Sequence, residues 1–238
     1  MKRIFTIVTC VFIATNLFAF NLPINDAGDV IATPLKVLAI ITLLSLIPVL
    51  LVSITSFTRI IVVLGFLRQG LGTQAGVPGP VLVTLAIFLT IFIMRPTFER
   101  INREAVQPYL RHEINDKEAI MRAIPAIREF MFRQVRQKDL GLLMSTAGLP
   151  KPANKDDVPI STLIPAFIMS ELRRAFQIGF VLYLPFLVID MVISSILLSL
   201  GMFMLPPMLI SLPFKLLLFV LVDGWNMVVK SLVASFNI

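Results

Sequence analysis

The segment that most constrains this chain is an apolar run from Met191 to Phe214 that is interrupted by glycine and proline. The run is twenty-four residues long and carries no charge, and that length is enough for a helix to cross the hydrocarbon core of a bilayer. Gly201, the pair Pro206-Pro207 and Pro213 interrupt it. Lipid cannot satisfy the backbone groups that a proline leaves unpaired, so such breaks are tolerated where protein or water surrounds them. The run is therefore atypical of a simple membrane anchor.

The interruption itself carries methionine and aromatic side chains. Met202, Phe203 and Met204 follow Gly201 and precede the proline pair, which places them on a turn. Methionine fills irregular gaps in ordinary apolar cores, so core packing is one interpretation. The other is a hydrophobic constriction, since such a gate needs bulky apolar side chains beside a helix break. We favour the constriction, which points to a pore rather than an active site.

The composition indicates an integral membrane protein, and the pattern of apolar segments predicts an all-α fold of helical hairpins with broken helices. Hydrophobic residues make up 57% of the 238 residues, and the mean hydropathy is +0.91, both above the range of ordinary globular domains. Residues 1–19 have the layout of a cleaved signal peptide, with Lys2 and Arg3 before an apolar stretch and the small Ala19 at its end. An uncleaved N-terminal anchor is the alternative. Cys10 lies in this segment, so the mature chain is expected to lack thiols, disulfides and cysteine metal sites.

The remainder divides by composition into three segments. Residues 20–94 contain a polar lead and a first apolar hairpin, whose two arms are joined by a short link from Arg59 to Gly76 that the positive-inside rule places in the cytoplasm. Residues 95–159 form a charged, amphipathic helical insert, which is then expected on the periplasmic side. Residues 160–238 hold a long helical stretch and the broken apolar segment with the methionine-rich turn.

The charge pattern and the motifs give little support for nucleic-acid binding or catalysis. The net charge is +7, but the basic residues do not gather on one stripe with interleaved aromatic residues, as a nucleic-acid surface requires. His112 is the only histidine and has no second histidine at zinc-protease spacing. The phosphate-binding loop and the serine nucleophile elbow are both absent from the sequence. We expect a protein that is not an enzyme and uses no cofactor or metal.

Four isolated charges lie in apolar surroundings: Glu171, Asp190, Lys215 and Asp223. An ionised side chain is costly there unless it is paired or faces water. They could line a conduit or relay protons. We favour the alternative that they form buried pairs and subunit contacts, because buried pairs more often specify packing than conduct.

Nine short motifs occur in order between about Thr33 and Trp225. They are FTRIIVVL (57–64), LGTQ (71–74), IPAF (164–167), SEL (170–172), AFQIGF (175–180), PFLVID (185–190), MLPP (204–207), SLPFKL (211–216) and VDGW (222–225). Together they resemble the motifs of the FliP family of flagellar export-gate proteins, and injectisome relatives share part of the pattern. The signal peptide, the Thr-Arg pair after Phe57 and the long charged insert are more similar to the flagellar branch.

The resemblance implies an all-helical subunit of the flagellar type III export gate. Family members assemble as five copies with FliQ and FliR into a helical cone at the bacterial inner membrane, within the flagellar basal body, and unfolded flagellar subunits pass through it. In the family a methionine-rich loop from each subunit forms a gasket across the closed pore. Met202, Phe203 and Met204 occupy that loop here, and Phe203 departs from the consecutive methionines of many members. The resemblance places Glu171 and Lys215 at helix and subunit contacts, and Phe130 and Phe132 at packing contacts of the insert.

Two functions of other classes remain as alternatives. A proton-coupled small-solute transporter would use Glu171 and Asp190 as proton sites, although the sequence lacks the internal repeat that such transporters often show. A structural scaffold of the basal body would tolerate alanine at Met202 and Met204 without leaking ions.

Overall fold

The computed structural model describes residues 37–38, 41–42, 44–45, 52–72, 77–150, 152, 154–202 and 204–236. The chain divides into two units, Met1–Pro48 and Val49–Ile238. In the first unit the described residues are helical, and the Thr42 hydroxyl donates to the Leu38 carbonyl at 2.8 Å. The expected signal peptide, 1–19, and Phe203 lie outside the described residues, as does about half of the first arm of the expected hairpin.

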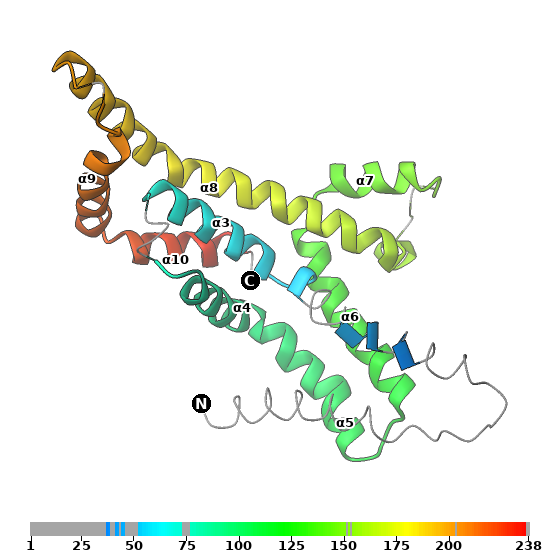
Figure 1. Ribbon diagram of the computed structural model, residues 1–238. Helices are drawn as coiled ribbons and strands as arrows, with labels where there is room; N and C mark the ends of the chain where they lie inside the picture. Colours follow the sequence, from blue (N-terminus) through cyan, green and yellow to red (C-terminus); the bar gives the residue numbers. More distant parts are fainter. Residues whose placement is uncertain are drawn as a thin grey trace. The chain divides into compact units, whose positions relative to one another are not determined.

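Helix α3, Phe57–Gly70, lies at the centre of the second unit between α8 and α4 (Figure 1). Its buried apolar residues recur every three or four positions, as expected for a helix packed on both sides: Ile60, Val63, Leu64 and Leu67. The expectation of a loop from Arg59 to Gly76 is therefore wrong for residues 59–70, which are helical, and Arg59 is fully buried. The cytoplasmic side of this link stays a prediction.

Helix α4, Gly79–Ile101, begins with proline at its second position, where the fixed φ angle suits a helix start. It continues through the π-helix η1, Asn102–Val106, into α5, Gln107–Leu110. The helical path thus runs through the expected segment boundary at Arg95, and the division at that point stays a prediction.

The insert folds into two further helices. Helix α6, Asp116–Gln134, starts at Asn115, whose side chain accepts from the Glu118 amide at 2.9 Å. Helix α7, Gln137–Thr146, packs on α8, and a 3₁₀ turn, η2 (Lys155–Asp157), leads toward α8. Arg128 ties this turn to α6 by donating to the carbonyl of Val158 at 2.6 Å.

Helix α8, Ile160–Ser199, runs for 40 residues and is followed by α9, Pro207–Leu221, and α10, Gly224–Ala234. At 1.5 Å per residue α8 is about 60 Å long, roughly twice the thickness of a hydrocarbon core. The expected break at Gly201 and Pro206-Pro207 is confirmed. Pro213 lies inside α9 and does not end it, so the interruption predicted there is wrong.

The prediction of an all-α membrane protein is confirmed for the part of the chain that the structure describes, which consists of helices and turns. Two helical stretches are long and apolar enough to cross a membrane, Gly79–Leu110 and Ile160–Ser199. The pair α9 and α10, bent by 65° at their junction, forms a third candidate if counted as one span. Most of the apolar surface of these helices is not covered by the chain itself, as expected for helices that face lipid or other subunits.

Candidate functional site

The methionine-rich turn lies at the end of the hairpin formed by α8 and α9, away from α6 and α7 (Figure 1). Gly201 has φ +70°, and the Met202 amide donates back to the Leu197 carbonyl at 2.9 Å, which ends α8 in the left-handed manner that glycine favours. Met202 is 45% exposed and Met204 is 95% exposed. Ordinary core packing within one chain therefore does not account for these two side chains.

The two arms of this hairpin are joined by an ion pair. The Lys215 ammonium lies 2.6 Å from Oδ2 of Asp190, and the Ser211 hydroxyl donates to Oδ1 of Asp190 at 2.6 Å. The side chain of Lys215 is 4% exposed and that of Asp190 is 30% exposed. The interaction fixes α9 against α8 below the methionine turn, as expected of a pair with a structural role.

Breaking this pair from one side is expected to cost more than removing it altogether. Asp190→Ala leaves the Lys215 ammonium buried without a counterion, and we expect a loss of about 1–3 kcal/mol in the free energy of unfolding. Asp190→Ala combined with Lys215→Met should recover most of that loss. Urea unfolding of the purified single and double variants measures the difference, and additive losses would contradict the pairing.

Glu171 is held by Arg59, and both side chains are fully buried. Arg59 Nε donates to Oε2 of Glu171 at 2.9 Å, and Nη2 donates to Oε1. The ion pair therefore joins α3 to α8 across 112 positions of sequence. Both carboxylate oxygens are engaged, as expected of a pair that specifies packing rather than of a carboxyl that exchanges protons with water.

The remaining donors of Arg59 bind two further segments. Nη1 donates to the carbonyl and the hydroxyl of Ser235, at 2.7 and 2.9 Å, and Nη2 donates to Gln134 at 3.0 Å. The guanidinium also stacks on the ring of Phe236, 3.7 Å from its centroid. All five N–H groups of Arg59 are thereby satisfied. Sequence reasoning missed this cluster, although an arginine and a glutamate isolated in two apolar segments were a signal for a pair.

Asp223 is exposed within this chain, contrary to the expected burial. It has φ +49° in the turn between α9 and α10, and it accepts from the Asn226 side chain at 2.9 Å. The turn carries the carboxylate outward while Gly224 packs on Phe219; a Cβ at Gly224 would lie 2.2 Å from that ring. A role of Asp223 in a subunit contact stays a prediction.

The two insert phenylalanines occupy different environments. Phe130 is buried and meets the ring of Phe167 on α8 edge to face, with centroids 5.9 Å apart. Phe132 is half-buried beneath the guanidinium of Arg128, 5.3 Å from its ring centroid. Phe130 thus holds α6 against α8 within one chain, and contacts of either residue with another subunit stay predictions.

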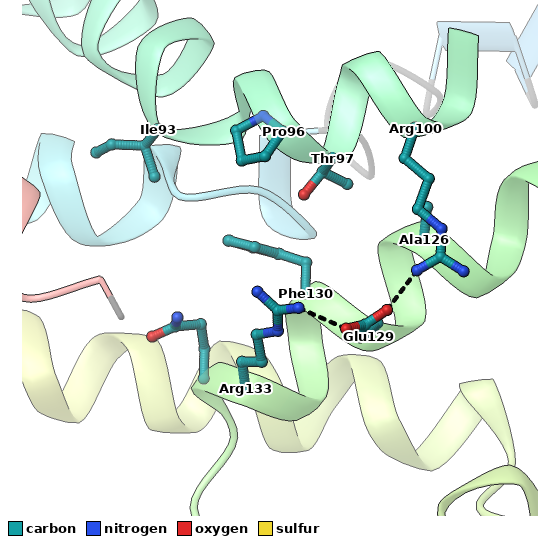
Figure 2. Close-up of a pocket in the computed structure, with 9 residues that line it drawn as sticks. Ile93, Pro96, Thr97, Arg100, Ala126, Glu129, Phe130 and Arg133 are labelled. Carbon is teal, nitrogen blue, oxygen red and sulfur yellow. Dashed lines mark hydrogen bonds and ion pairs between the residues drawn. The ribbon is translucent and has the colours of Figure 1, made fainter. Parts of the chain in front are cut away.

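A small cavity of about 90 Å³ lies between α4 and α6. Figure 2 shows Glu129 at its edge, bridging Arg133, at 2.5 Å, and Arg100. Hydrogen bonds from Arg133, which has the larger effect, and from Arg100 lower the pKa of Glu129. The volume admits a few waters but no organic cofactor. Among the described residues, no three His, Cys, Asp or Glu side chains gather as a metal site would require.

The lowered pKa of Glu129 predicts an acid-sensitive contact between α4 and α6. A depressed carboxyl pKa contributes stability that is present above the ordinary value of about 4.3 and is lost as the pH falls through the folded-state value. We therefore expect the hydrogen-exchange protection factors of amides at the contact to fall below about pH 4. In Glu129→Gln these protection factors should already be lower at neutral pH and should lose this pH dependence. Equal pH profiles for the two proteins would contradict the assignment.

Comparisons with known proteins identify relatives over nearly the whole chain. The model of the FliP family matches residues 40–232. The chain is 51% identical over 221 residues to the flagellar biosynthetic protein FliP of Bacillus subtilis, covering 93% of this chain and 98% of that protein. It is 43% identical to FliP of Aquifex aeolicus over the full length of both. For FliP of Cereibacter sphaeroides the identity is 52%, over 92% of this chain and 72% of that protein.

Proposed function

Because this chain belongs to the FliP family, we propose that it is a pore-forming subunit of the flagellar type III export gate. In this proposal it lies in the bacterial inner membrane with a periplasm-side insert, and unfolded flagellar subunits pass through the pore. About five copies, together with FliQ and FliR, would make up the gate. The role requires neither a catalytic residue nor a cofactor from this chain.

The observation that carries the proposal is the exposure of Met202 and Met204 on a turn between two apolar helices. Large apolar side chains at the tip of a hairpin remain in water unless another surface covers them. In a ring of subunits, the same side chains from each copy can cover one another and close the axis. A constriction of thioethers excludes water and ions, and it can adapt to the varied side chains of a passing polypeptide.

We expect Met202→Ala combined with Met204→Ala to produce an ion leak without loss of assembly. Alanine removes most of the apolar volume from the seal, so water can enter the closed constriction. The measurement is ion flux in cells that express this chain with the other gate proteins, together with copurification of the complex. Met121→Ala is the matched control, because Met121 is similarly exposed but lies on α6 of the insert. A variant that assembles and does not leak ions would favour a structural scaffold and would show that these residues do not form the seal.

The proton-coupled transporter is less well supported than the pore. Its two candidate proton sites are Glu171, whose oxygens are both engaged by Arg59, and Asp190, which is engaged by Lys215 and Ser211. A proton carrier needs a carboxylate that can release its partner and reach water. The contacts of these two groups favour structural roles instead.

A further inference from the structure

Beyond residue 175, one side of α8 contacts the rest of the described chain and the opposite side is exposed. The buried residues on this stretch recur at helical spacing and define the inner face: Ala175, Gly179, Phe186 and Leu197. The opposite side carries an exposed row at spacings of seven, four and three residues, here called the outer stripe: Gln177, Leu184, Val188, Met191, Ser195 and Ser199.

The exposed polar side chains of this stretch are confined to the outer stripe. Between residues 176 and 199 they are Gln177, Ser195 and Ser199. The exposed residues beside the stripe are all apolar, and we call them the shoulders: Phe176, Phe180, Leu187 and Leu198 on one side, and Val181, Pro185, Val192 and Ile196 on the other. The polar groups therefore lie at the point of the helix furthest from the protein core.

This arrangement is the reverse of what a lipid-facing helix shows. Polar side chains within membrane segments turn toward the protein interior or toward a water-filled path, and apolar side chains turn to lipid. Here the outermost row carries the amide and the hydroxyls. Apolar shoulders on both sides suit contacts with neighbouring helices, and a helix that packs on both shoulders leaves only the outer stripe open. Such a helix is a suitable wall element of a ring.

We propose that the outer stripe of α8 lines the water-filled conduit and contacts an unfolded polypeptide in transit; this inference rests on the pore function proposed above. The Ser195 and Ser199 hydroxyls donate to the carbonyls of Met191 and Ile196, at 2.9 and 2.8 Å, and keep lone pairs free to accept. Uncharged hydroxyl and amide groups exchange hydrogen bonds with water and with the backbone of any extended chain. They supply contact without selecting for sequence or charge.

The test is cysteine accessibility in the assembled gate. The only native cysteine, Cys10, is replaced by serine, and single cysteines are introduced by Ser195→Cys and Gln177→Cys on the stripe and by Leu187→Cys and Val192→Cys on the shoulders. Membranes opened to both sides are treated with a charged, membrane-impermeant thiol reagent, with and without an export substrate stalled by a folded domain. Copurification of the gate proteins confirms that each variant assembles.

We expect the stripe positions to react about tenfold faster than the shoulders or more, because the thiolate that reacts is disfavoured in apolar surroundings. The stalled substrate should slow the labelling of the stripe cysteines and leave the labelling of the shoulder cysteines unchanged. Shoulder cysteines that react as fast as the stripe cysteines would overturn the inference. So would a stripe labelled only by a lipid-soluble reagent, or a stripe that the stalled substrate does not protect. If the alanine variants at Met202 and Met204 leak but the stripe fails this test, the pore stands and its wall lies elsewhere. If neither responds, the pore function fails as well.

Discussion

Glu171→Gln is expected to lower the free energy of unfolding by about 3–5 kcal/mol, the cost of leaving a buried arginine without its counterion. The substitution preserves the shape of the side chain, so the loss reports the charge. Arg59 is fully buried, and its five N–H groups donate to Glu171, Gln134 and Ser235. The measurement is urea unfolding of the purified chain in detergent, followed by the fluorescence of Trp225, its only tryptophan.

Two further variants separate the ion pair from other causes. Arg59→Met combined with Glu171→Leu removes both charges and should cost much less than Glu171→Gln alone, since buried pairs replaced by apolar groups are often neutral. Glu99→Gln breaks the exposed pair that Glu99 forms with Arg95 at 2.7 Å, and it should cause no measurable change. Normal stability of Glu171→Gln with lost export would contradict the packing role and restore the proton-active alternative.

Gly179→Leu is expected to destabilise the contact between α3 and α8 at or above the upper end of the roughly 1–3 kcal/mol typical of overpacking. A Cβ at Gly179 would lie 2.5 Å from Cδ2 of Phe66 and 2.9 Å from its Cβ. The second distance is to the Cβ of Phe66, which does not move when the ring rotates, so rotation of the ring cannot relieve the clash. The α3 helix would have to move away from α8, and its buried residues would lose contact.

Gly65→Leu is the matched control, because it lies on the same helix as Phe66 with no atom within 4 Å of its added Cβ. There the substitution should be neutral or should stabilise the helix by up to about 1 kcal/mol, the difference in helix propensity between glycine and leucine. Combining Gly179→Leu with Phe66→Ala should recover part of the loss. Equal effects of the two glycine variants on unfolding would show that close helix approach is not the reason for Gly179.

The contact between α3 and α8 lies far from the methionine turn of the proposed gate. The Arg59–Glu171 pair and the Gly179–Phe66 contact both hold the first half of α8, whereas Met202 lies just beyond its far end. Glu171 and Ser199 are separated by about 42 Å of continuous helix at 1.5 Å per residue. A small change of tilt at the fixed end would therefore be enlarged at the methionine turn.

The amino-acid sequence by itself determined the helices, the apolar character of the chain and the break at Gly201. Helical periodicity, glycine and proline act over a few residues, so their effects can be predicted from neighbours in sequence. The same local reasoning placed Met202 and Met204 on a turn, and their exposure agrees with it. Local reasoning failed where the same residue is compatible with two structures. Pro213 lies inside a helix instead of ending it, and Arg59 lies in the core instead of a loop.

Only the tertiary structure decided which charges meet. Glu171 and Lys215 were expected in buried pairs, but their partners, Arg59 and Asp190, lie 112 and 25 residues away, and no periodicity specifies contacts at such separations. The central position of α3 was likewise set by packing, because a short apolar helix gains most by burying both faces between longer ones. Local interactions thus determined the helices and the turn. Their arrangement was determined by the burial of side chains that are far apart in sequence, because every buried charge must be paired in the packed structure.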